Sequence, residues 1–235
     1  MSRTKGAFIV LEGIDGAGTT THSARLVQAL EAAGHAAYLT REPSNGPIGT
    51  LIRQVLSRRL VVPTAEGPRP PGFATMALLF AADRMDHLEA EILPRLQRGE
   101  VVVSDRYDYS SVVYQSATSD DPEAVAAWTR ELNRYARRPD LVLVLDVDVD
   151  EATRRRSSRR GEEEIFDADE LQRRLASGYR ALSRFFPEDR VVFVDASQPI
   201  EAVAEEVRRQ VLALLHPAGV GRTPRVAQQQ RTASS

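Results

Sequence analysis

The stretch Glu12–Leu30 reads EGIDGAGTTTHSARLVQAL, and it decides the fold. Gly13, Gly18 and Thr20 occupy the fixed positions of the phosphate-loop pattern G-x-x-x-x-G-K-[ST]. An apolar run, Phe8–Leu11, precedes the stretch, and residues with helical spacing follow it. This order predicts a buried strand, a loop whose backbone N–H groups bind an anion, and a helix whose positive N-terminus faces that anion.

One position departs from the pattern, because Thr19 stands where lysine is expected. Lys5 is the only lysine among the 31 basic residues, and it precedes the first strand, at the end opposite to the loop. Arg25 lies farther along the expected helix, on a different face. Two interpretations stay open at this point: a nucleotide site whose positive charge comes from elsewhere, and a glycine-rich turn between strand and helix.

Further short apolar runs alternate with helical patterns along the chain. They lie in HAAYLTREP (35–43), GEVVVSDRY (99–107), PDLVLVLDV (139–147) and RVVFVDA (190–196). Nearly continuous Val, Leu and Ile are typical of strands that are buried on both faces of a parallel sheet. We therefore expect a doubly wound α/β fold with five parallel strands between two layers of helices.

Length and composition favour a single domain of this class. The chain has 235 residues, of which 42% are hydrophobic, enough for a sizeable core. A net charge of -2 gives no global attraction to nucleic acid or to an anionic membrane. The chain has no cysteine, which excludes disulfides and cysteine-based metal sites and fits a reducing cytoplasm. The N-terminal apolar run is too short for a signal peptide, and no run reaches the roughly 20 apolar residues of a membrane helix.

Two segments interrupt the alternation, and the chain ends in a third of different composition. VVPTAEGPRPPG (61–72) is rich in proline and glycine and is expected to be a loop. RRRSSRRGEEEIFDADE (154–170) is densely charged. We expect the folded domain to span residues 1–216 and the polar tail, residues 217–235, to be disordered.

Five stretches occur in the order and spacing of bacterial thymidylate kinases, so the chain resembles that family over residues 6–215. They are FIVLEGIDGAGTTT, TREPSNGPIGTLIRQVL, LLFAADRMDHL, SDRYDYSSVVYQ and PDLVLVLDV. The resemblance implies a P-loop NTPase-type fold and transfer of the γ-phosphoryl group of ATP to dTMP, giving dTDP, with Mg²⁺ as cofactor. It also implies a cytoplasmic homodimer that binds neither nucleic acid nor a membrane, with a short mobile lid at about residues 152–168.

The resemblance implies an ATP site in the phosphate loop and a magnesium site beside it. The loop residues are Gly13, Ile14, Asp15, Gly16, Ala17, Gly18, Thr19 and Thr20. Thr20 would place its hydroxyl on the ion, and Asp105, at the end of an expected strand, would help to hold it. Asp15 would approach the nucleotide sugar and orient the acceptor. An N-terminal cap or a surface ion pair is the structural alternative for Asp105.

For the acceptor, the resemblance implies a pocket whose residues come from three stretches of the chain. They are Glu42, Pro43, Arg53, Phe80, Arg84, Arg106, Ser110, Tyr114 and Gln115. Arg53 and Arg106 would bind the acceptor phosphate, a task that suits the planar, permanently charged guanidinium. Glu42 and Pro43 would form part of the pocket wall.

The remaining acceptor residues would bind the nucleoside. Phe80 and Arg84, four residues apart on a helix, would share a face toward the thymine base. Ser110 and Gln115 would reach the base edge, where an amide offers both a donor and an acceptor, and Tyr114 would lie near the sugar. A solvated helix charge is the alternative for Arg53, and a plain core position is the alternative for Phe80.

A second departure lies in the lid, where the family has an acidic-Arg-x-Glu pattern and this chain has Glu164–Asp167, EIFD. Both departures remove positive charge near the transferred phosphoryl group, and one preorganised donor is worth about 3–4 kcal/mol. We hypothesise that arginines of the charged segment replace it. They are Arg154, Arg155, Arg156, Arg159 and Arg160, with Arg156, Arg159 and Arg160 as catalytic candidates beside Asp15, Asp105 and Arg106. The alternative is a solvated helix face.

Three functions therefore stay open on the sequence. The first is a dTMP kinase, the second a kinase for another nucleoside monophosphate or for a deoxynucleoside. The third is a nucleotide-binding homologue without turnover. A panel of acceptor nucleotides separates the first two, and turnover separates both from the third.

Overall fold

The computed structural model of the protein describes residues 6–157 and 169–216. The predicted lid is therefore described only as far as Ser157, and the lid residues Arg159, Arg160 and Glu164–Asp167, on which predictions were made, lie outside the described residues. The predicted disordered tail and Lys5 also lie outside them.

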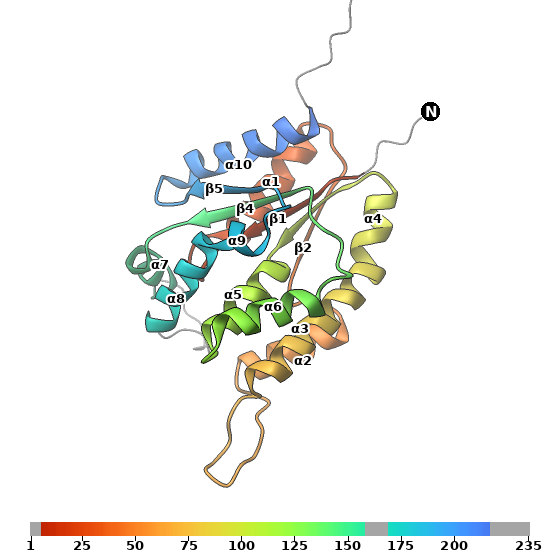
Figure 1. Ribbon diagram of the computed structural model, residues 1–235. Helices are drawn as coiled ribbons and strands as arrows, with labels where there is room; N and C mark the ends of the chain where they lie inside the picture. Colours follow the sequence, from red (N-terminus) through yellow and green to blue (C-terminus); the bar gives the residue numbers. More distant parts are fainter. Residues whose placement is uncertain (1–5, 158–168, 217–235) are drawn as a thin grey trace, which may run out of the picture.

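A parallel sheet with the strand order β2-β3-β1-β4-β5 forms the centre of the molecule (Figure 1). Its five strands are β1 (Phe8–Glu12), β2 (Ala37–Arg41), β3 (Val101–Asp105), β4 (Leu141–Asp146) and β5 (Val191–Asp195). The inner strands β1, β3 and β4 are buried almost throughout, whereas the edge strands β2 and β5 are partly exposed. The apolar runs therefore predict the strands correctly.

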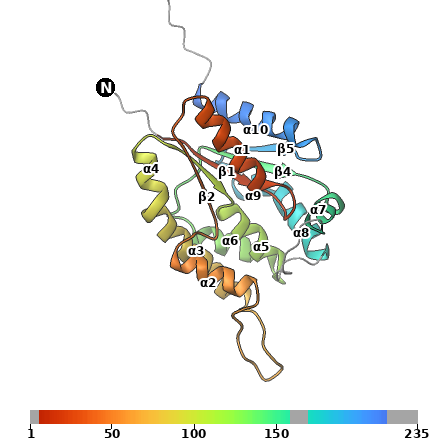
Figure 2. The ribbon, with the colours of Figure 1, turned by 180° about the vertical axis from the view of Figure 1, so that it is seen from behind.

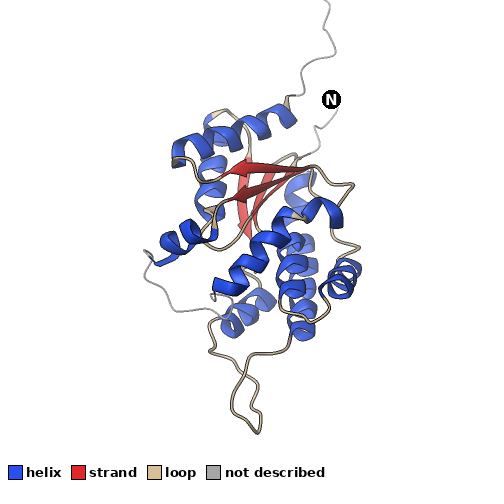
Figure 3. Cartoon of the chain, turned by 60° about the vertical axis from the view of Figure 1, so that its left-hand side comes forward, coloured by secondary structure: helices blue, strands red, loops and turns tan. Residues whose placement is uncertain are grey.

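Helices cover both faces of the sheet. Seen from behind, α1 (Thr19–Ala32) and α10 (Ile200–Leu215) lie side by side over one face (Figure 2). The opposite face carries α3 (Phe73–His87), α4 (Leu93–Gln97), α5 (Asp108–Ala117) and α8 (Asp169–Arg180), which Figure 1 labels. Figure 3 shows the strands in red with helices on both sides of them. With the glycine loop between β1 and α1, this arrangement confirms the predicted three-layer P-loop NTPase-type fold.

Shorter helices complete the structure. They are α2 (Pro47–Leu56), the π-helical turn η1 (Leu88–Ile92), α6 (Pro122–Leu132), α7 (Val149–Ser157) and α9 (Leu182–Phe185). The helical pattern between the proline-rich segment and β3 is divided into α3, η1 and α4. The π turn ends at Ile92, two residues before Pro94, whose nitrogen has no N–H to donate to the helical hydrogen-bond pattern.

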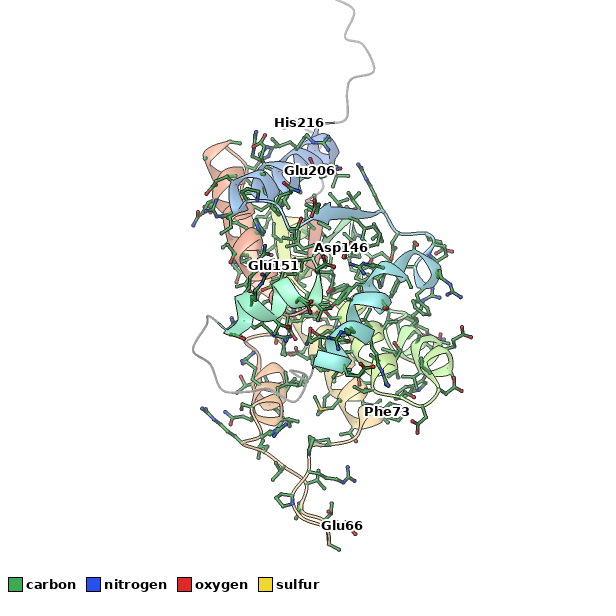
Figure 4. All side chains as sticks on the ribbon, turned by 90° about the vertical axis from the view of Figure 1, so that its left-hand side faces the viewer. Glu66, Phe73, Asp146, Glu151, Glu206 and His216 are labelled. Atoms are coloured by element: carbon green, nitrogen blue, oxygen red, sulfur yellow. The ribbon has the colours of Figure 1, made fainter. Side chains whose placement is uncertain are left out.

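The proline-rich segment between α2 and α3 extends away from the rest of the molecule. Figure 4 shows Glu66 at its far end and Phe73 at its base. Val62 and Arg69 form an antiparallel bridge across it, a detail that the composition did not predict. In the parts of the chain that the structure describes, helices long and apolar enough to cross a membrane are absent.

Candidate active site

The loop between β1 and α1 has the backbone of an anion-binding turn. Gly16 and Gly18 have φ angles of 93° and 97°, a region that side chains rarely adopt, and Gly18 directly precedes the first residue of α1. A Cβ on Gly16 would lie 2.3 Å from the carbonyl oxygen of Ala152. The loop therefore packs directly against the first turn of α7. The positive φ angles favour glycine at both positions, and the contact with Ala152 leaves no room for a side chain at Gly16.

Thr20 and Asp105 meet at the carboxyl ends of the inner strands. The Thr20 hydroxyl donates a hydrogen bond of 2.6 Å to Asp105 Oδ2. Asp105 is buried, and its Oδ1 has no hydrogen-bond partner in the described parts of the chain. A hydroxyl and a carboxylate beside a phosphate loop suit Mg²⁺, which takes few protein ligands and completes its shell with phosphate oxygens and water. The two residues therefore fit the implied ion.

Beside this pair lies a pocket of about 220 Å³. Its lining contains every residue that the sequence assigned to the acceptor, together with Asp15: Glu42, Pro43, Arg53, Phe80, Arg84, Arg106, Ser110, Tyr114 and Gln115. Residues that the sequence reasoning missed complete it, namely Arg41, Leu56, Tyr107 and Ser111. The structure therefore brings the three predicted stretches together around one cavity.

Arg106 connects this pocket to the phosphate loop. It follows β3 with a φ of 73° and donates to the Gly13 carbonyl oxygen at 2.9 Å. Its guanidinium also donates to Ser110 Oγ at 3.1 Å and to the Tyr179 hydroxyl at 2.9 Å, and it forms an ion pair with Asp15. Four protein groups thus fix one cation in the lining of the pocket.

Asp15 is the point where three segments of the chain meet. Besides Arg106, it accepts hydrogen bonds from the Tyr114 hydroxyl at 2.9 Å and from Gln172 Nε2 at 3.3 Å. Gln172 and Tyr179 both belong to α8 and were missed in the sequence. Their spacing of seven residues, two helical turns, places them on one face and is the signal that could have identified them.

Glu12 belongs to the same hydrogen-bond network. The sequence analysis did not predict it, because in the sequence it resembles an ordinary polar residue at the end of a strand. Its Oε1 accepts from the Tyr107 N–H at 2.8 Å and its Oε2 accepts from the Ser110 hydroxyl at 2.7 Å. The Tyr179 hydroxyl donates to Oε2 at 3.2 Å. Complete burial raises the pKa of Glu12 to about 7, although Arg106 and these hydrogen bonds act in the opposite direction.

The raised pKa predicts a pH-dependent stability that Glu12→Gln removes. Below about pH 4.5 the carboxyl is protonated in both folded and unfolded chains, so its burial as a charged group does not lower the free energy of unfolding. Between 4.5 and about 7 the unfolded chain ionises first, so the free energy of unfolding falls as the pH rises. The free energy of unfolding of Glu12→Gln minus that of the wild type should therefore increase by about 3 kcal/mol from pH 4.5 to pH 8.

Denaturant unfolding followed by circular dichroism at several pH values measures this difference. Other titrating groups are common to both proteins and cancel in the subtraction. Parallel pH profiles for the two proteins would show that Glu12 ionises at its ordinary pKa and would contradict the prediction.

The pocket lining also contains groups that suit an uncharged, planar ligand edge. Gln115 is 1% exposed, and its Nε2 has no hydrogen-bond partner among the described residues. Phe80 contributes an aromatic ring to the wall and packs against a small core cluster. Arg84 is buried behind them, where it forms an ion pair with Glu42 and donates to Ser111 Oγ at 3.0 Å. The pocket lining therefore combines arginines with a buried amide and an aromatic ring.

The chain matches the family model described as Thymidylate kinase over residues 11–207. The chain belongs to the thymidylate kinase family. It is 39% identical to "Probable thymidylate kinase" from Pyrococcus abyssi, an alignment that covers 90% of this chain and 96% of the relative. It is 40% identical to "Probable thymidylate kinase" from Thermococcus kodakarensis, covering 88% and 96%. It is 41% identical to "Thymidylate kinase" from Alkalilimnicola ehrlichii, covering 85% and 89%.

Arg53, which the resemblance to thymidylate kinases assigned to the acceptor phosphate, lies on α2 and turns back to the loop after β2. It donates to the Pro43 carbonyl oxygen at 3.0 Å and to Thr50 Oγ1 at 3.0 Å. It also donates to the Ser44 carbonyl oxygen. Its position in the pocket lining means that it is not merely a solvated charge on the helix surface.

The arginines proposed to replace the lysine of the thymidylate kinase loop are described only in part. Arg154 and Arg155 form ion pairs with Glu151, which Figure 4 shows on α7, and Arg155 donates to the Ala196 carbonyl oxygen at 3.0 Å. Arg156 donates to Thr153 Oγ1 at 3.0 Å. These contacts run along α7 and to the end of β5, and the replacement hypothesis stays a prediction. Arg25, the other cation near the loop in sequence, forms an ion pair with Glu201 of α10.

Proposed function

We propose that this protein is a thymidylate kinase, which transfers the γ-phosphoryl group of MgATP to dTMP and gives ADP and dTDP. The observation that carries the proposal is a pocket beside the phosphate loop. Its lining combines the guanidinium groups of Arg53 and Arg106 with the buried amide of Gln115. A nucleoside monophosphate combines the same two features, an anion and an uncharged base edge, and family membership selects dTMP among them.

In this proposal the acceptor phosphate is bound by Arg53 and Arg106. Gln115 and Ser110 bind the thymine edge, and Phe80 lies against the ring. Tyr114 lies near the sugar, as its hydrogen bond to Asp15 supports. Arg84 points toward the base from behind, and its pairing with Glu42 supports a positioning part in the wall that Glu42 and Pro43 form.

The donor phosphates bind to the loop from Gly13 to Thr20, and Thr20 and Asp105 hold Mg²⁺. The ion, when bound, neutralises charge that develops on the phosphate oxygens. Phosphoryl transfer has a loose transition state, so positioning and charge neutralisation supply most of the catalysis. Arg106 supports both tasks, because four protein groups fix its charge between the loop and the pocket. Asp15 orients the acceptor through Tyr114 and Arg106.

The domain boundaries and the assembly belong to the same proposal. Residues 1–216 form the kinase domain with a lid at about 152–168, and residues 217–235 form a disordered tail. Thr19 takes the place of the loop lysine, and Arg156, Arg159 or Arg160 brings positive charge to the phosphates from the lid. The protein acts as a cytoplasmic homodimer, as the resemblance to the family implies, and binds no nucleic acid or membrane.

A coupled assay of dTDP formation tests the function, with dTMP, dUMP, dCMP, dAMP and dGMP as acceptors beside the same chain with Gln115→Leu. We expect dTMP to be preferred. We expect Gln115→Leu to raise the KM for dTMP by about 10-fold to 100-fold, since it removes hydrogen bonds to the base edge. A purine preference would contradict the thymine assignment. Nucleotide binding without turnover, measured by calorimetry, would favour the silent homologue.

A further inference from the structure

Arg41 lies at the junction between the acceptor pocket and the proposed magnesium site. It ends β2 and is paired in register with Asp105 of β3, and paired residues of neighbouring parallel strands project from the same face. Thr40 contacts His87 of α3 at 2.7 Å on one face of the sheet. Since successive side chains alternate, Arg41 belongs to the opposite face, where α1 places Thr20 on Asp105.

The arginines of the pocket lining differ in their contacts with the protein. Arg84 is buried against Glu42, Arg106 is fixed by Asp15 and the Gly13 carbonyl, and Arg53 donates to backbone carbonyls. Within residues 6–157 and 169–216, Arg41 makes a single side-chain hydrogen bond, of 3.4 Å to Asn45 Oδ1, and no ion pair. That distance is at the weak end of hydrogen bonding. Its guanidinium is thus exposed and open to a ligand.

We propose that Arg41 is a catalytic residue that binds the phosphoryl group in transit and supplies, together with the lid arginines proposed above, the positive charge that Thr19 does not. The inference rests on the proposed function. In the reaction, an oxygen of the dTMP phosphate forms a bond to the γ-phosphorus, and the bond from that phosphorus to the bridging oxygen of ADP breaks. The electron pair of the broken bond leaves with ADP. Arg41 gains and loses no proton, because the guanidinium is permanently charged.

The chemistry of the side chain matches this task. In the transition state the negative charge is spread over three equatorial oxygens, and a guanidinium can donate two parallel hydrogen bonds to two of them. Thr19, by contrast, offers one neutral hydroxyl. Arg41 approaches the site from the end of the edge strand β2, whereas a loop lysine would approach it from the connection between β1 and α1.

A double-mutant cycle tests the proposal, with dTDP formation measured for the wild type, Arg41→Ala, Thr19→Lys and the double variant. Arg41→Ala should lower kcat about 100-fold, with a smaller change in the KM for dTMP. Thr19→Lys should change the wild-type kcat less than about 3-fold, yet raise the kcat of Arg41→Ala about 10-fold or more. Arg208→Ala, which removes a surface arginine paired with Glu205 on α10, is the matched control and should leave kcat unchanged.

The rescue separates a charge contribution from a structural one, because a lysine on α1 cannot repair the packing of β2. A second variant, Arg41→Gln, keeps a polar side chain without the charge and should show the same loss of kcat with a wild-type melting temperature. Equal kcat for Arg41→Ala and the wild type, or strictly additive effects in the cycle, would overturn the assignment of Arg41. No dTDP from the wild type at all would overturn the proposed function beneath it.

Discussion

Replacing Arg106 by alanine should lower kcat/KM for dTMP by about 1,000-fold, the upper range for one preorganised charged donor. The side chain is mostly buried and is fixed by Asp15, Gly13, Ser110 and Tyr179, so no neighbour can move into its place. The loss has a second component, because Asp15 would keep a charge without its cationic partner. Arg106→Lys should recover only part of the rate, since one ammonium group cannot reach all four partners.

Steady-state kinetics with dTMP and ATP varied separately measure this effect. The loss should be larger for dTMP than for ATP, because Arg106 lines the acceptor pocket. Arg134→Ala is a suitable control, since Arg134 forms an ion pair with Glu131 on an exposed surface and should leave the rate unchanged. A wild-type kcat/KM for Arg106→Ala would exclude Arg106 from phosphate binding.

The second large effect is expected at Gly16. A Cβ there would lie 2.3 Å from the Ala152 carbonyl oxygen, a backbone atom that cannot move without shifting α7. Gly16→Ala should therefore lower kcat at least 100-fold and reduce the free energy of unfolding by about 2 kcal/mol, since strain at positive φ adds to the clash. The kinetic assay and thermal unfolding measure the two parts separately.

Gly34→Ala is the matched control for this prediction. Gly34 has a similar φ of 86°, but nothing lies within 4 Å of its added Cβ. It should therefore show the conformational cost of positive φ, about 1 kcal/mol, with unchanged kcat. If both variants behaved alike, the contact between the loop and α7 would be irrelevant to activity.

The fold follows from local sequence patterns with little need of tertiary information. The apolar runs of β1, β3 and β4 are long enough and continuous enough to identify buried parallel strands. The glycine loop identifies the first strand-to-helix connection. The division of α3 from α4 by a π turn was not predictable in the same way, because the helical period continues through it and only Pro94 indicates a local change.

The pocket lining was predictable, through the family resemblance, where one short stretch carries several candidate site residues. The stretch after Asp105 is an example, since Arg106, Ser110 and Gln115 all line the same pocket. Tyr179 and Glu12 were not predictable in this way, because their parts depend on burial and on partners far away in the sequence. Arg41 was not predicted for a related reason. It lies next to Asp105 only in the paired strands β2 and β3, and the two residues are far apart in the sequence.

The buried ion pair behind the pocket has a consequence for how this sequence can vary. Glu42 and Arg84 are almost fully buried, and either one alone would leave an uncompensated charge in the protein interior. A single replacement at either position therefore lowers the free energy of unfolding more than the simultaneous replacement of both by apolar residues does. Evolutionary drift along this wall should proceed by paired substitutions, so that related sequences change Glu42 and Arg84 together or keep both.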